Sequence, residues 1–168
     1  MFGGIRKRLE SMRAIRMLCR QAELHARRDA KTEPGAEHFM LAALDLPDGT
    51  ARAAFAQVGA NASSFGDAIA HQYDEALRHI GIEPPTVPRH GPRGDAGSAG
   101  GGLYHTSASG GQVMRALTAG RKDHVPLVGA HVVAVVADME QGVAARALEA
   151  MGVDRGALKR AAEGAARA

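Results

Sequence analysis

The sequence has only one cysteine, two tyrosines and four phenylalanines, and it has no tryptophan. A single cysteine cannot form an internal disulfide, which favours a reducing compartment, and we predict a cytoplasmic protein. Cys19 lies on an apolar segment without a second thiol or a paired histidine, so we interpret it as a small core residue. With so few aromatic residues, the core must come mainly from Ala, Leu, Val, Ile and Met, which suits closely packed helices.

Sequence motifs of catalysis are also missing. No Gly-x-x-x-x-Gly-Lys-[Ser/Thr] loop is present to hold a nucleotide phosphate, so ATP hydrolysis is not expected. No Gly-x-Ser-x-Gly elbow or His-Glu-x-x-His motif occurs, and the eight histidines show no metal-ligand spacing. We therefore expect a protein that is not an enzyme, with no catalytic residue, no cofactor and no metal.

Long apolar runs are absent as well. The most apolar stretch, residues 127–136, contains His131 and is far shorter than the roughly 20 residues that cross a bilayer. The basic N-terminal residues are followed by an amphipathic segment rather than by the apolar core and cleavage site of a signal peptide. We therefore expect neither secretion nor a membrane partner.

Apolar residues repeat at steps of three or four along most of the chain, which predicts helices. The first would be a long amphipathic helix that buries one stripe, formed by Ile5, Leu9, Met12, Ile15, Cys19, Ala22 and Ala26. Three more are predicted over 37–44, over 50–58, and from a capping-box-like Ser64-x-x-Asp67 to Ile80. In the second half, helices are predicted around 112–121, 130–139 and 143–151, and from 154 onward. Gly110 and Gly111 should delay the first of these, because a helical glycine costs about 1 kcal/mol.

The two halves repeat one plan on either side of a segment rich in proline and glycine. We assign residues 1–81 to a first repeat, 82–103 to a linker and 104–168 to a second repeat. A constant offset of 93 residues pairs His38 with His131, Asp45 with Asp138, Gly49 with Gly142 and Gly59 with Gly152 without a gap. The predicted fold is therefore all-α, with two four-helix pseudo-repeats that form two lobes.

The spacing of these residues resembles the Clp N-terminal (Clp R) domain of the ATPases ClpA and ClpC over nearly the whole chain. The most specific matches lie in the second repeat: Val128-Gly129-Ala130-His131, Gly142-Val143-Ala144-Ala145-Arg146-Ala147-Leu148 and Gly152-Val153-Asp154. The first repeat has Gly35-Ala36-Glu37-His38, with weaker similarity around Gly49 and Gly59. The resemblance implies a stand-alone binding protein that recognises clients, adaptors or Clp subunits and modulates a Clp chaperone–protease.

The resemblance also implies where a ligand would bind. In several ClpC-type members the matching helix starts hold tagged substrates, including phosphoarginine, with an acidic residue on the guanidinium and backbone groups on the phosphate. Carried over by position, the first site would use Gly35, Glu37 and His38, and the second would use Gly129 and His131. Ala130 stands where the second site needs its acid, so at most one phosphoarginine site is expected.

A different function is suggested by four arginines spaced seven residues apart: Arg6, Arg13, Arg20 and Arg27. This spacing keeps them on one face of a helix, with a drift of only about 20° per step. The alternative is therefore a basic helical protein that binds nucleic acid or another anionic partner. The formal net charge is only +3 and no aromatic residues lie along the stripe to stack on bases, so nucleic acid is the less favoured partner.

Overall fold

The computed structural model describes residues 3–86 and 104–168. Within these ranges all regular structure is helical, which confirms the all-α prediction. Four α-helices lie in the first half: α1 (Gly3–Arg28), α2 (Ala36–Asp45), α3 (Thr50–Gln57) and α4 (Phe65–His79), with a 3-10 turn, η1 (Ala62–Ser64), before α4. Four more lie in the second: α5 (Ala108–Ala119), α6 (Gly129–Ala137), α7 (Val143–Ala150) and α8 (Arg155–Arg167).

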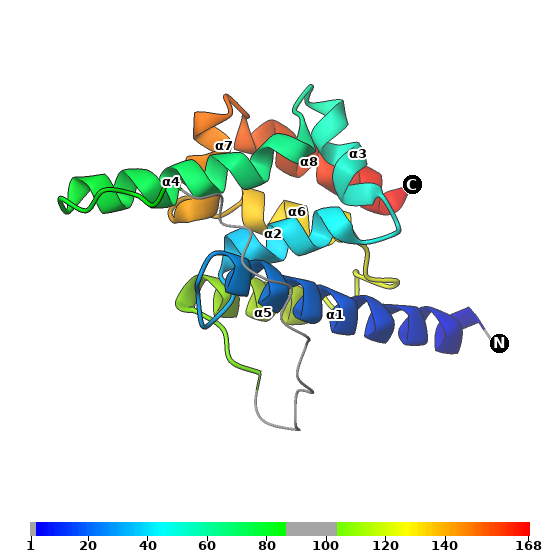
Figure 1. Cartoon of the computed structure of the whole chain (residues 1–168). Coiled ribbons are helices and arrows are strands. Elements are labelled where there is room, and N and C mark those ends of the chain that lie inside the picture. The colour runs from blue at the N-terminus through cyan, green and yellow to red at the C-terminus, as the bar shows by residue number, and fades with distance from the viewer. Residues whose placement is uncertain (1–2, 87–103) are drawn as a thin grey trace.

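The helices form three layers with α2 and α6 in the middle (Figure 1). Below them lie α1 and α5, and above them lie α3, α4, α7 and α8. The middle helices are mostly Ala, Val and other apolar residues around their whole circumference, as expected for helices covered on several sides. Eight residues of α2 and six of α6 are buried. This places the starts of both helices inside the molecule.

The two halves share one core instead of forming separate lobes. α3 packs against α8, α4 packs against α7, and α2 packs against α6. Phe55 and Phe65 meet edge to face with their ring centroids 6.1 Å apart, in one cluster that extends to Val133 and Leu158 of the second half. Most of the predicted linker, residues 87–103, lies outside the described residues.

Three predictions about helix ends are wrong. α5 begins at Ala108, so Gly110 and Gly111 lie inside it and do not delay it. The side chain of Ser64 makes no capping hydrogen bond, because the 3-10 turn leads directly into α4. Ile80, predicted on the inner face of α4, is 68% exposed, since the end of α4 extends past the other helices (Figure 1).

The predicted buried stripe of α1 is also wrong over its first half. Ala22 and Ala26 are buried, but Ile5 and Leu9 are 62% and 52% exposed. Steps of three and four residues do not match the 3.6-residue turn, so the stripe rotates around the axis as it advances. The N-terminal turns of α1 extend past the body (Figure 1).

No helix in residues 3–86 and 104–168 has both the length and the apolar character that crossing a bilayer requires.

Candidate functional site

The first candidate site is the start of α2, where His38 acts as a buried cap. The backbone N–H of Gly35 donates to His38 Nδ1 at 2.9 Å. Because Nδ1 accepts this bond, the ring proton belongs on Nε2, which lies 3.1 Å from Asp29 Oδ2. His38 is only 1% exposed. The histidine that the sequence assigned to ligand binding therefore connects the start of α2 to the segment that follows α1.

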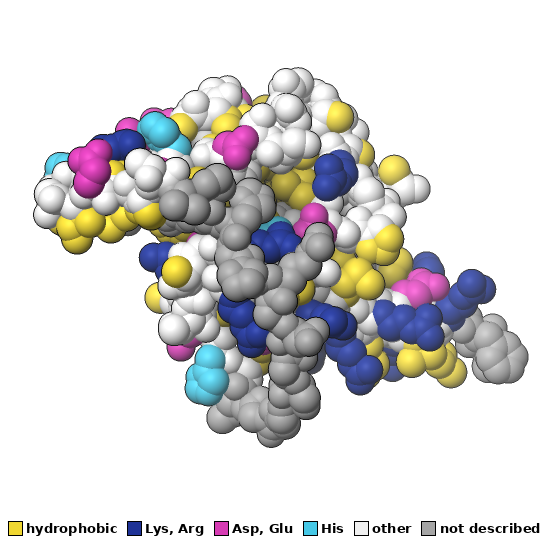
Figure 2. All heavy atoms as spheres, viewed as in Figure 1, with side chains coloured by type: hydrophobic (Ala, Val, Ile, Leu, Met, Phe, Trp, Pro, Cys, Tyr) yellow, Lys and Arg dark blue, Asp and Glu magenta, His cyan; other side chains and the backbone are white. Residues whose placement is uncertain are grey.

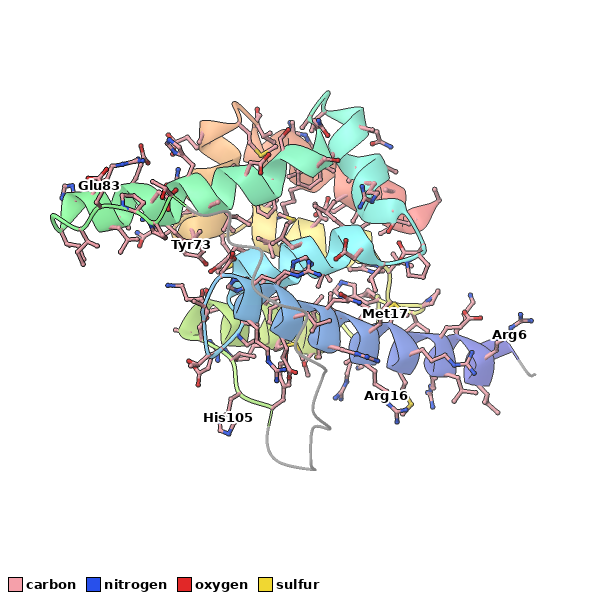
Figure 3. The ribbon with its side chains drawn as sticks, in the orientation of Figure 1. Arg6, Arg16, Met17, Tyr73, Glu83 and His105 are labelled. Atoms are coloured by element: carbon pink, nitrogen blue, oxygen red, sulfur yellow. The ribbon has the colours of Figure 1, made fainter. Side chains whose placement is uncertain are left out.

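Glu37 is also engaged within the protein. The hydroxyl of Tyr73 on α4 donates to Glu37 Oε1 at 2.6 Å, and Figure 3 shows Tyr73 beneath α4, on the side that faces α2. A Cβ on Gly35 would lie 2.6 Å from Glu37 Oε2, so the carboxylate folds closely over Gly35, and a larger residue there would have to displace it. This places a negative charge at the positive end of the α2 dipole. With 8% of its surface exposed, Glu37 offers little to an external cation.

The start of α5 closes the same site from outside. The N–H of Ala36 donates to Ser109 Oγ at 3.1 Å, and the N–H of Ser107 donates to the carbonyl oxygen of Pro34 at 3.1 Å. Gly110 fits between them, because a Cβ there would lie 2.3 Å from that carbonyl oxygen and 3.2 Å from Phe39. The second half of the chain thus fills the position where a ligand would meet the first N–H groups of α2.

The second candidate site, at the start of α6, repeats the histidine cap. The N–H of Val128 donates to His131 Nδ1 at 3.1 Å. The next two N–H groups are satisfied by Asp48, in the loop before α3, and by Thr50, the first residue of α3. Gly129 donates to both Asp48 oxygens at 3.3 and 3.1 Å, and Ala130 donates to Thr50 Oγ1 at 2.9 Å. Asp48 therefore supplies the carboxylate that Ala130 cannot. Asp48 and Thr50 were not among the predicted site residues.

The two histidine caps differ in what their rings face. His131 stacks on His124, with ring centroids 4.2 Å apart and planes inclined by 33°, whereas His38 faces a carboxylate. Burial, and next the neighbouring His124, lower the pKa of His131 from 6.5 to about 4. His124 Nδ1 is buried, and none of the described residues forms a hydrogen bond with it. At neutral pH His131 is therefore an uncharged acceptor for the Val128 N–H.

The low pKa of His131 predicts a loss of stability in acid. Between pH 6.5 and about 4 the unfolded chain binds a proton at this residue and the folded chain does not, so stability falls as the pH is lowered through that window. The unfolding temperature should differ less between about pH 7 and about pH 4.5 in His131→Gln than in the parent. Glutamine keeps an acceptor for the Val128 N–H and does not titrate. His105 is exposed and points away from the body (Figure 3), so His105→Gln should behave like the parent; an unchanged pH response in His131→Gln would contradict the assignment.

A hollow of about 530 Å³ adjoins the histidine pair between α5, α6 and α8. Its walls carry charges of both signs, and Lys159 Nζ pairs with Asp138 Oδ1 across it at 2.7 Å. The hollow gives access to the sides of His124 and His131. It does not free the first N–H groups of α6, which Asp48 and Thr50 hold.

The remaining predicted residues lie on α1. Arg6, Arg13, Arg20 and Arg27 are all exposed, and Arg6 makes an ion pair with Glu10 at 3.4 Å. Cys19 is partly buried, and this burial raises the pKa of its thiol, which keeps it protonated. In the part of the chain that the structure describes, no group of three His, Cys, Asp or Glu side chains is placed to hold a metal ion.

A comparison with protein-family models found no matching family, and a comparison with curated proteins found no matching sequence.

Proposed function

We propose that this protein is a non-catalytic binding protein of the Clp N-domain type. It would recognise a client, an adaptor or a Clp subunit and modulate a ClpA- or ClpC-type chaperone–protease. The observation that carries the proposal is the equivalence of the two histidine caps. His38 and His131 are 93 residues apart, and each accepts a hydrogen bond from the residue that precedes its helix.

The boundaries of the helices support the same repeat. α2 and α6 begin at residues 36 and 129, and α3 and α7 run over 50–57 and 143–150, so each pair is offset by 93 residues. Gly49 and Gly142, which precede α3 and α7, both have positive φ, as do Gly59 and Gly152, which follow them. Glycine adopts this backbone conformation without the steric penalty that a side chain brings. An offset that accounts for both the helix limits and the positive φ of the flanking glycines favours a duplicated unit over a chance match.

Helix packing fits a pseudo-twofold arrangement of these units. In the proposed repeat α7 is the counterpart of α3, and α8 is the counterpart of α4. A contact between α3 and α8 should therefore have its own counterpart in a contact between α7 and α4. Both contacts are present, and α2 packs on its counterpart α6. We propose on this basis the two four-helix pseudo-repeats of the Clp N-domain, with their helices interleaved around one core.

The two helix starts argue against phosphoarginine as the ligand. Glu37 bonds to Tyr73, and the first N–H groups of α6 are held by Asp48 and Thr50. A ligand at the start of α2 would have to break the buried hydrogen bond between Tyr73 and Glu37, and a ligand at the start of α6 would have to displace Asp48 and Thr50 from the N–H groups that they hold. We therefore propose that recognition uses an outer surface of the molecule.

The direct test is a reconstituted ClpC–ClpP or ClpA–ClpP protease that degrades labelled casein. Adding the purified protein at concentrations comparable to the ATPase should change the degradation rate, and the protein should co-migrate with the ATPase in size-exclusion chromatography. Calorimetry with free phosphoarginine should give no binding, for the parent and for Glu37→Gln alike. Absence of both complex formation and a rate change would contradict the proposal. Phosphoarginine binding that is lost in Glu37→Gln would show instead that the start of α2 opens.

The nucleic-acid alternative depends on the exposed arginines of α1. Binding to a duplex would weaken steeply with added salt, because each neutralised phosphate releases bound counterions. A complex with a Clp subunit that is held mainly by apolar contacts should lose less affinity as salt is added.

A further inference from the structure

The N-terminal turns of α1 expose an apolar stripe that no other described helix covers. Ile5, Leu9 and Met12 are 62%, 52% and 53% exposed. At about 100° per residue, these three side chains fall within about 60° of each other around the helix axis. Leu18 and Ala22, which are fully buried against the body, lie about 120° further round. The stripe therefore faces away from the body.

Basic side chains surround this stripe. Residues 3–20 contain six basic residues, which are Arg6, Lys7, Arg8, Arg13, Arg16 and Arg20, against one acidic residue, Glu10. All six are exposed. Figure 2 shows Lys and Arg side chains interspersed with hydrophobic ones along this end of the molecule. In Figure 3, Arg6 and Arg16 extend from α1 into solvent.

The charge of this segment decides between possible partners. A second copy that docked in the same way would bring two strongly basic helices together, and like charges repel. A nucleic acid would neutralise the arginines but leave Ile5, Leu9 and Met12 in water. An anionic lipid surface satisfies both features, because the acyl region accepts apolar side chains while the headgroups attract Lys and Arg.

We propose that the N-terminal turns of α1 bind the surface of an anionic lipid bilayer. Ile5, Leu9 and Met12 enter the boundary between headgroups and acyl chains, and Arg13 and Arg16 contact lipid phosphates. The helix lies along the membrane plane, so no membrane-spanning segment is needed. The sequence predicted no membrane partner because it has no segment that could span a bilayer. That reason does not exclude a helix that lies on the membrane surface. The proposal is independent of the Clp-type function, which does not require α1 to be free.

Flotation of the full chain with vesicles tests the proposal. Vesicles of phosphatidylglycerol mixed with phosphatidylcholine should carry the protein, and vesicles of phosphatidylcholine alone should not. Each basic residue near an anionic surface contributes a factor of about five in partitioning, so Arg13→Glu combined with Arg16→Glu should weaken binding by more than about tenfold. Leu9→Gln combined with Met12→Gln should also lower binding by about tenfold or more, through the lost burial of two apolar side chains.

Matched variants at the other end of the molecule serve as controls. Arg78 and Arg146 are exposed on α4 and α7, and reversing both makes the same change in net charge as reversing Arg13 and Arg16. Ile80 and Ile82 are 68% and 51% exposed, so Ile80→Gln with Ile82→Gln matches the apolar change. Both controls should bind like the parent. The proposal fails if anionic vesicles do not carry the parent, or if the controls lose as much binding as the α1 variants. It also fails if Leu9→Gln with Met12→Gln binds unchanged, because the segment would then be attracted to any polyanion, including duplex DNA.

Discussion

Replacing Gly110 with alanine is expected to lower the free energy of unfolding by about 3 kcal/mol, the upper part of the usual range for overpacking. The added Cβ would lie 2.3 Å from the carbonyl oxygen of Pro34 and 3.0 Å from Thr106 Cβ. The nearest of these atoms belongs to the backbone at the start of α2, so it cannot rotate away as a side chain can. Chemical unfolding of the parent and the variant, followed by circular dichroism, measures the difference.

The neighbouring glycine provides the control. A Cβ on Gly111 would meet only Arg115 Nη1 at 3.3 Å and Thr106 Oγ1 at 3.4 Å, and at least the long arginine side chain can move. Gly111→Ala should therefore stabilise the protein by up to about 1 kcal/mol through the higher helix propensity of alanine. If both alanines stabilise the protein, α5 does not pack on Pro34 in solution as the structure shows.

These two glycines show what the sequence could and could not predict about the fold. Periodicity and turn residues located the α-helices of residues 3–86 and 104–168 within a few residues, because those signals are local. Helix propensity argued that Gly110 and Gly111 delay α5, and the structure shows that this is wrong. The contact that makes a glycine necessary at residue 110 comes from Pro34, far away in the chain. Propensity along one helix cannot reveal it.

The apolar stripe of α1 illustrates a second limit. Periodicity identified the helix correctly, and it also predicted that the whole stripe is buried. Burial depends on how far the neighbouring helices extend, and the body covers Leu18, Ala22 and Ala26 but not Ile5 or Leu9. An amphipathic pattern alone does not distinguish a face that packs in the core from a face that is left for a partner.

The sequence predicted which residues lie at the two helix starts but not what surrounds them. The 93-residue spacing matched His38 with His131, and in the structure both accept a hydrogen bond at the start of a central helix. The groups that occupy the sites were missed, because they come from the other half of the chain. Ser109 is 73 residues from Ala36, and Asp48 is 81 residues from Gly129. Sequence spacing within one repeat contains no signal for such contacts.

Asp48→Ala is expected to lower the free energy of unfolding by about 2 kcal/mol, because it removes a charged cap from a buried helix start. Asp48 accepts hydrogen bonds from the N–H of Thr50 at 2.9 Å and from the N–H of Gly129 with both oxygens. Its loss leaves the N–H of Gly129 without its acceptor and removes a negative charge from the positive end of the α6 dipole. Asp48→Asn keeps an acceptor oxygen and should recover about half of the loss.

Amide hydrogen exchange distinguishes the local loss of the bond between Asp48 and Gly129 from a general loss of stability. In Asp48→Ala, exchange at Gly129 should accelerate more than exchange at Gly35, whose N–H is held by His38 within its own helix. Asp154→Ala is the matched control, because Asp154 caps the N–H of Ala157 at the start of its own helix, α8, at 3.0 Å. That variant should accelerate exchange at Ala157 and leave Gly129 unchanged. If Gly129 exchanges at the parental rate in Asp48→Ala, the loop before α3 does not cap α6, and the start of α6 is available to a ligand after all.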